Sequence, residues 1–136
     1  MSNECSLCKS EFDLFKGKCI PYAFNIVYYV DYYNENIQIF NPDKKDIIYA
    51  IKIENEIMDP ISQFNFKNYP NNKVYFYFLE ETPISLSNLF DNNIRLIDFS
   101  FNIKYINNFK FTNIKGMLSG CSSLIFISIY LKLKVL

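Results

Sequence analysis

An internal repeat in the last third of the chain constrains the fold more than any other feature. Residues 89–101 (LFDNNIRLIDFSF) and 117–129 (MLSGCSSLIFISI) align without a gap at an offset of 28 residues. In each copy an apolar pair precedes a short polar turn, and an alternating apolar run follows it. A fixed offset indicates one supersecondary unit, translated so that each copy buries the face its neighbour leaves open. We therefore predict that 94–101 and 122–129 lie parallel as neighbouring strands.

The repeat also predicts which side chains form its core. The apolar residues before and after each turn recur in both copies and should face the interior together. Cys121, at the second turn, is expected to pack as a small buried residue because a free cysteine behaves as a compact hydrophobe. The predicted repeat core consists of Leu89, Phe90, Leu96, Phe99, Phe101, Met117, Leu118, Cys121, Leu124, Ile127 and Ile129.

Residues 20–84, upstream of the repeat, alternate strand-like runs with turn signals. The run 23–30 is dense in apolar residues, 63–67 alternates strictly, and 74–79 is rich in aromatic residues. Branched and aromatic side chains suit a pleated surface, and the chain holds 11 Tyr and 14 Phe against 3 Gly. Short strands with turns at this spacing predict a small antiparallel, sandwich-like module.

Residues 45–58 leave two alternatives open. Apolar side chains at 47, 49, 51 and 53 favour a strand, with a reversal at Glu54-Asn55-Glu56. The apolar side chains at 47, 48 and 51 also fit one face of a helix.

Residues 1–19 hold three of the four cysteines, Cys5, Cys8 and Cys19. In an exported protein they would share one disulfide and leave one cysteine to pair upstream of Met1, with Cys121 reduced. A structural zinc site needs four ligands, so Cys121 would have to come from a distant segment. Free thiols are the third alternative. The chain thus divides by sequence into 1–19, 20–84 and 85–136.

The chemistry of most enzymes is missing from the sequence. His is absent, which removes the commonest general base and metal ligand, and no Gly-rich phosphate loop or nucleophile elbow occurs. The carboxylates Glu54, Glu56, Glu80 and Glu81 stand at predicted strand ends, where charged residues mark solvent. We therefore expect no catalytic residues, cofactor or metal.

Charge and hydropathy restrict the partners. The 14 basic and 14 acidic residues give a net charge of zero and form no basic run, so a nucleic-acid partner is not expected. The longest apolar stretch near the end, 124–131, is too short to span a bilayer as a helix. The first residues lack the basic and apolar pattern of a signal peptide.

Residues 117–124, followed by Ile127 and Ile129, resemble the BspA-like leucine-rich repeats of microbial surface proteins. Those repeats place Leu three residues after Cys, an aliphatic residue three further on, and another two further. Cys121, Leu124, Ile127 and Ile129 match this pattern in the second copy. The first copy matches as Asn93, Leu96, Phe99 and Phe101. Leu118 replaces the usual Phe, and the long period places an insertion between Phe101 and Asn113.

Cys5-x2-Cys8, with Leu14, Gly17 and Cys19, resembles the end of a growth-factor-receptor-type cysteine-rich repeat. Together the resemblances imply a mainly β ectodomain fragment, with a sandwich-like module followed by about two leucine-rich-repeat rungs. They imply cell-surface display, adhesion and contact with a protein or surface ligand, without catalysis. An intracellular leucine-rich-repeat scaffold, favoured by the missing signal peptide, and a truncated gene product are the alternatives.

The end of the chain predicts a further property. Residues 130–136 alternate as a strand but cannot form another repeat or a capping helix. An uncapped last rung exposes its apolar face and sheet edge. We therefore expect the isolated chain to be marginally stable and to self-associate through 122–136.

Overall fold

The fold is mainly β, with several antiparallel sheets, and no sheet formed by the described residues closes on itself. The computed structural model describes residues 8–31, 36–68, 70–124 and 126–127. In chain order the elements are β1 (Phe12–Phe15), β2 (Lys18–Pro21), β3 (Phe24–Tyr29), β4 (Asn36–Gln38), the 3-10 helix η2 (Pro42–Ile47), β5 (Ala50–Ile53), β6 (Glu56–Met58), β7 (Gln63–Asn65), β8 (Asn71–Tyr77), β9 (Pro83–Ser85), β10 (Leu96–Phe101), the 3-10 helix η3 (Ile106–Asn108), β11 (Lys110–Asn113) and β12 (Phe126–Ile127).

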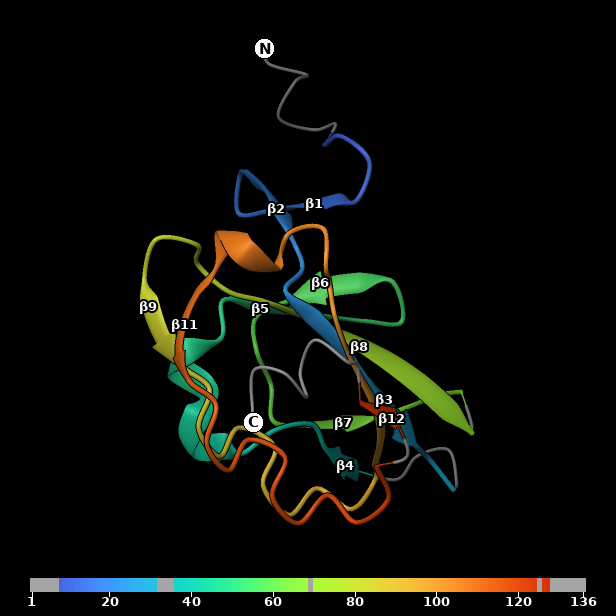
Figure 1. Cartoon of the computed structure of the whole chain (residues 1–136). Coiled ribbons are helices and arrows are strands. Elements are labelled where there is room, and N and C mark those ends of the chain that lie inside the picture. The colour runs from blue at the N-terminus through green and yellow to red at the C-terminus, as the bar shows by residue number, and fades with distance from the viewer. Residues whose placement is uncertain (1–7, 32–35, 69, 125, 128–136) are drawn as a thin grey trace.

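The largest sheet has six strands in the order β12–β10–β3–β8–β5–β6 (Figure 1). Its pairs are antiparallel except β10–β12, which is parallel and brings Phe99 opposite Ile127. This pairing confirms the predicted parallel neighbours as far as the described residues reach, and Ile129 lies outside them. Two-stranded sheets β1–β2 and β4–β7 are antiparallel, whereas β9–β11 is parallel.

The sheet forms because alternate residues of its strands supply one aromatic layer. In β3, Phe24, Ile26 and Tyr28 are buried while the residues between them are less buried. Phe24 lies opposite Phe76 of β8 and opposite Phe101 of β10, with ring centroids 5.3 Å and 6.1 Å away. Such cross-strand aromatic pairs are the main side-chain stabilisation of a sheet.

The segments 20–84 and 85–136 share this sheet. β10, from the repeat, pairs with β3, from the middle of the chain, and one cluster of buried residues extends through both. The boundary near residue 84 marks a change in sequence pattern, and the hydrophobic core continues across it.

The structure divides the ambiguous stretch 45–58. Pro42–Ile47 forms η2, whose first turn is capped by Asn41 Oδ1 accepting from the Asp43 amide at 3.0 Å. The rest is the hairpin β5–β6, with positive φ at Glu54 (53°) and Asn55 (68°). The predicted reversal is therefore confirmed, and the helical alternative holds for η2 only, as a 3-10 helix.

Cys8 and Cys19 form a disulfide beside the hairpin β1–β2, and Cys121 is a free thiol. The zinc and free-thiol alternatives are therefore wrong for Cys8 and Cys19, while Cys5 lies outside the described residues. Figure 1 places this hairpin at the N-terminal end of the molecule, away from the stacked segments that follow β9 and β11.

Candidate functional site

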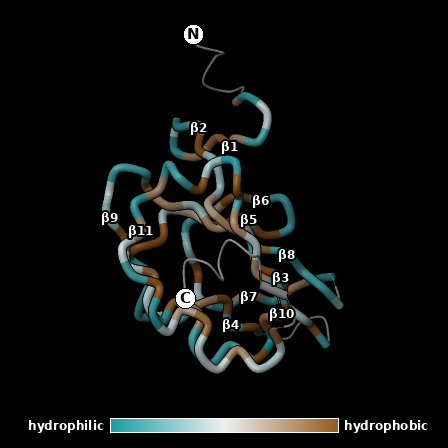
Figure 2. The backbone as a smooth tube through the Cα atoms, in the orientation of Figure 1, coloured by the Kyte–Doolittle hydropathy of each residue, from teal (hydrophilic) through white to brown (hydrophobic). Residues whose placement is uncertain are grey.

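The repeated sequence forms two stacked backbone coils, which we name coil one (residues 86–96) and coil two (residues 114–124). In Figure 1 their yellow and orange traces run side by side, and in Figure 2 brown and teal stretches alternate along them. Each coil closes on itself through four bonds from an amide to the carbonyl three residues earlier. In coil one the donors are Leu89, Asp91, Asn93 and Leu96, and in coil two they are Met117, Ser119, Cys121 and Leu124. Every donor and acceptor of coil one therefore recurs 28 residues later in coil two.

The two coils also share their positive backbone angles. Asn88 and Asn92 have φ of 60°, and the equivalent Gly116 and Gly120 have φ of 70° and 75°. A Cβ built at either glycine would overlap the Oδ1 atom of the asparagine stacked against it. Coil two therefore needs glycine at these positions for its conformation and for the space that the asparagine amides occupy.

A ladder of backbone bonds joins the coils. The amides of Leu86, Asn88, Phe90 and Asn92 donate to the carbonyls of Asn113, Lys115, Met117 and Ser119 at 2.7, 3.3, 3.0 and 2.6 Å. Every second amide of coil one is thus satisfied by coil two, in continuation of the β9–β11 pairing. The stacking is a property of the backbone, which accounts for its tolerance of different side chains in the two copies.

The polar residue at the corner of each coil donates to the layer before it. The Asn93 amide nitrogen donates to the Gln38 carbonyl at 3.0 Å, and the equivalent Cys121 thiol donates to the Phe90 carbonyl at 3.1 Å. Asn93 Oδ1 also accepts from the Arg95 amide at 3.2 Å. Burial raises the pKa of the Cys121 thiol, so it stays protonated at neutral pH and serves as a structural donor.

The structure places most of the predicted repeat core in the interior. Phe90 is fully buried and lies 5.2 Å from Phe76, ring centroid to ring centroid, in an edge-to-face arrangement. The other buried members are Leu89, Leu96, Phe99, Phe101 and Met117. Those partly buried against the same core are Leu118, Cys121 and Leu124.

A polar hollow of 460 Å³ lies where residues 36–41 meet the turn 91–95 of coil one. Within it Asn41 Nδ2 donates to Asp91 Oδ1 at 3.3 Å. At its edge the guanidinium of Arg95 lies 3.4 Å from Asp31 Oδ2. Ile94, which is 63% exposed, supplies an apolar side chain to the same hollow. Amide, carboxylate, guanidinium and apolar groups in one concave site suit binding of a polypeptide surface.

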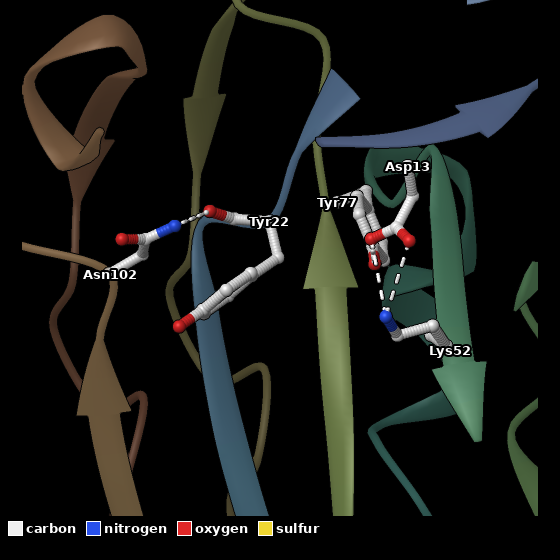
Figure 3. A network of polar contacts seen from close by, with 5 residues as sticks. All are labelled: Asp13, Tyr22, Lys52, Tyr77 and Asn102. Atoms are coloured by element: carbon white, nitrogen blue, oxygen red, sulfur yellow. Dashed lines mark hydrogen bonds and ion pairs between the residues drawn. The ribbon is translucent and has the colours of Figure 1, made fainter. Parts of the chain in front are cut away.

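A second polar cluster, shown in Figure 3, joins the β1–β2 hairpin to the six-stranded sheet. The Tyr77 hydroxyl donates to Asp13 Oδ2 at 2.5 Å, and Lys52 Nζ lies 3.3 Å from both oxygens of that carboxylate. Burial, together with the bond to Asp13, raises the pKa of Tyr77 well above its ordinary value. The phenol therefore stays protonated, and the cluster acts as an attachment between two elements.

Metal and membrane features were also sought in the structure. Among the described residues, no three His, Cys, Asp or Glu side chains gather in a way that could hold a metal ion. No helix in that part of the chain has the length and apolar character needed to cross a bilayer.

Comparisons of the chain with models of protein families, with curated proteins and with solved structures found no match. The resemblance to BspA-like repeats therefore depends on the repeat residues themselves. Sequence reasoning missed the hollow, because residues 36–41 are 50 or more positions before the coil residues they contact. The pairing of Asn88 and Asn92 with Gly116 and Gly120 had a visible signal in the 28-residue offset.

Proposed function

We propose that this chain is a non-catalytic recognition module that binds other proteins at a cell surface. In this proposal a sandwich-like β-module carries two rungs of the BspA-like leucine-rich-repeat type, preceded by the end of a growth-factor-receptor-type cysteine-rich repeat. The observation that carries the proposal is the exact recurrence of the coil bonds 28 residues apart. A period of 20–29 residues with one strand per unit is typical of leucine-rich repeats.

The disulfide Cys8–Cys19 supports the surface location. Disulfides persist in oxidising compartments and are rare in the cytosol, where thiols are kept reduced. This bond favours an exported protein over the alternative of an intracellular scaffold.

The polar clusters support recognition over catalysis. The Tyr77 hydroxyl and the Cys121 thiol have raised pKa values and donate to protein acceptors, so neither is an activated nucleophile. The hollow beside coil one has the mixed polar and apolar lining expected of a protein contact.

Antibody labelling of the source cells tests the location. We expect an antibody raised against the folded chain to label intact cells as strongly as permeabilised cells. Labelling that requires permeabilisation would contradict surface display and favour the intracellular scaffold.

Beads coated with the chain test adhesion and the role of the hollow. Beads carrying the native chain should adhere to at least one of a panel of immobilised matrix proteins or host-cell layers. Ile94→Ser should weaken this adhesion on the order of tenfold, because an exposed apolar side chain in a concave contact is a typical anchor.

Ile103→Ser is the matched control for the adhesion assay. Ile103 is 66% exposed, similar to Ile94, but lies outside the hollow, so this variant should adhere like the native chain. Equal losses in the two variants would mean that the hollow is not the contact. Failure of the native chain to adhere to any surface would contradict the adhesive function.

A further inference from the structure

The outer edge of coil two carries a row of backbone donors without acceptors. The amides of Ile114, Gly116, Leu118 and Gly120 have no acceptor within residues 8–31, 36–68, 70–124 and 126–127. Their equivalents in coil one, Leu86, Asn88, Phe90 and Asn92, all donate to coil two. The edge of coil two therefore repeats the donor spacing of coil one with the acceptors missing.

This donor edge is poorly matched to a second donor edge. The carbonyls of Ile114, Gly116, Leu118 and Gly120 already accept bonds inside coil two or just after it. Two copies of the chain that met edge to edge across a two-fold axis would oppose donors to donors. A symmetric dimer through this edge would leave those amides unsatisfied, at a cost that disfavours it.

A head-to-tail contact between copies is blocked as well. Its acceptor would be the outer side of coil one, where the Leu89 carbonyl already accepts from the Asn41 amide at 2.8 Å. The Asn88 carbonyl likewise accepts from Asn41 Nδ2 at 3.2 Å. Residues around Asn41 therefore cover the side of coil one that a second copy would need.

We propose that the donor edge 114–120 docks an extended segment of a partner protein. The segment runs parallel to coil two and presents a carbonyl oxygen at every second residue, as residues 113–119 do for coil one. Gly116 and Gly120 have no side chains, which leaves their amides accessible to a backbone. Recognition through main-chain bonds fixes direction and register and depends little on partner side chains. This inference rests on the proposed protein-binding function and names the form of its partner.

Amide hydrogen exchange measured by NMR on the full chain tests the donor edge. In the free chain, the amides of Ile114, Gly116, Leu118 and Gly120 should exchange at least tenfold faster than those of Leu86, Asn88, Phe90 and Asn92. Equal protection of the two sets would overturn the proposal, because the edge would already be covered.

The probe for docking is a synthetic peptide with the sequence of residues 110–124 and the change Cys121→Ser. It contains the carbonyl spacing that coil one accepts in the structure. At millimolar concentration it should slow exchange of the four edge amides at least tenfold and leave the coil-one amides unchanged. A peptide of the same composition in reversed order is the control and should leave all eight unchanged.

A tethered form guards against weak binding of a flexible peptide. The same sequence, joined after Leu136 by a Gly/Ser linker, has an effective concentration in the millimolar range. Unchanged exchange of the four edge amides in both formats, or slowing spread evenly over the molecule, would overturn the docking edge. Surface labelling and bead adhesion are independent of this result, so failure of the docking edge leaves the proposed function standing.

Discussion

Coil one and coil two follow the same backbone path in different surroundings. Coil one lies between residues 37–41 on one side and coil two on the other, and its Phe90 is fully buried against Phe24 and Phe76. Coil two has coil one on one side only, and its equivalent Leu118 is partly buried. Local bonds and positive φ positions thus define the path of a coil, while the layers on either side determine how much each side chain contributes to stability.

The coils also divide the residues that permit positive φ. Coil one uses Asn88 and Asn92, whose side chains extend towards coil two, and coil two uses Gly116 and Gly120, which leave room for them. The two copies are therefore complementary rather than interchangeable. An asparagine layer requires a glycine layer next to it.

The largest expected difference between the coils comes from truncating the equivalent apolar residues. Phe90→Ala should lower the free energy of unfolding by about 3–5 kcal/mol, because it opens a cavity among packed aromatic rings. Leu118→Ala should cost about 1–2 kcal/mol, because a partly buried side chain loses less contact. Urea unfolding followed by circular dichroism measures both, and equal losses would show that coil two is covered as completely as coil one.

Adding a methyl group to coil two tests the complementarity of asparagine and glycine. Gly120→Ala should cost about 2–3 kcal/mol, from strain at positive φ and overlap with the Asn92 side chain. Gly17→Ala is the control, since its φ is 79° and a Cβ there has no neighbour within 4 Å. It should cost only about 1 kcal/mol, the strain alone.

The double variant Gly120→Ala with Asn92→Gly isolates the overlap. Removing the asparagine side chain should recover about 1 kcal/mol of the loss, which a double-mutant cycle reports as coupling between the two positions. Strictly additive losses would mean that the coils adjust their spacing without cost.

The same comparison explains how far sequence reasoning reached. The 28-residue offset predicted the parallel pairing of Phe99 with Ile127, and turn chemistry predicted the hairpin reversal at Glu54 and Asn55. These features depend on translation or on residues adjacent in sequence. The stretch Asn41-Pro42-Asp43 indicated a turn, and its use as the cap of a 3-10 helix follows from the same local chemistry.

Features that depend on distant contacts could not be predicted. β10 lies beside β3 because Phe99 and Phe101 pack with Phe24, and alternation alone does not say which strands become neighbours. The contact of Asn41 with coil one spans 47 residues and has no periodic signal. Self-association through 122–136 stays a prediction, since residues 128–136 lie outside the described part of the chain.

The corner residues give a smaller difference between the coils. Asn93→Ala should cost about 2–3 kcal/mol, because it leaves the buried Gln38 carbonyl and the Arg95 amide without partners. Cys121→Ala should cost about 0.5–1 kcal/mol, because a thiol is a weak donor and is only partly buried. Thermal melts of the two variants rank them. A larger loss for Cys121→Ala would reverse the expected order of the layers.

The smallest expected effect concerns a single backbone donor in each coil. Replacing the amide of Phe90 or of Leu118 by an ester, in chains assembled from synthetic fragments, removes one N–H and keeps the side chain. The Phe90 ester should lower the free energy of unfolding by about 0.5–1.5 kcal/mol, because its amide donates to the Met117 carbonyl at 3.0 Å. The Leu118 ester should leave it within about 0.5 kcal/mol of the native chain, since that amide has no acceptor among the described residues.

The pair of esters therefore compares the two coils with all side chains unchanged. Ester substitution also weakens the carbonyl before it as an acceptor, and both positions share that effect to a similar degree, so the difference between the two variants reports the lost donor. Guanidinium unfolding of the two esters and the native chain measures this difference. A Leu118 ester as destabilising as the Phe90 ester would mean that coil two already has a backbone neighbour on its outer side. A neutral Leu118 ester would instead leave that amide available to a partner, as the difference between the coils requires.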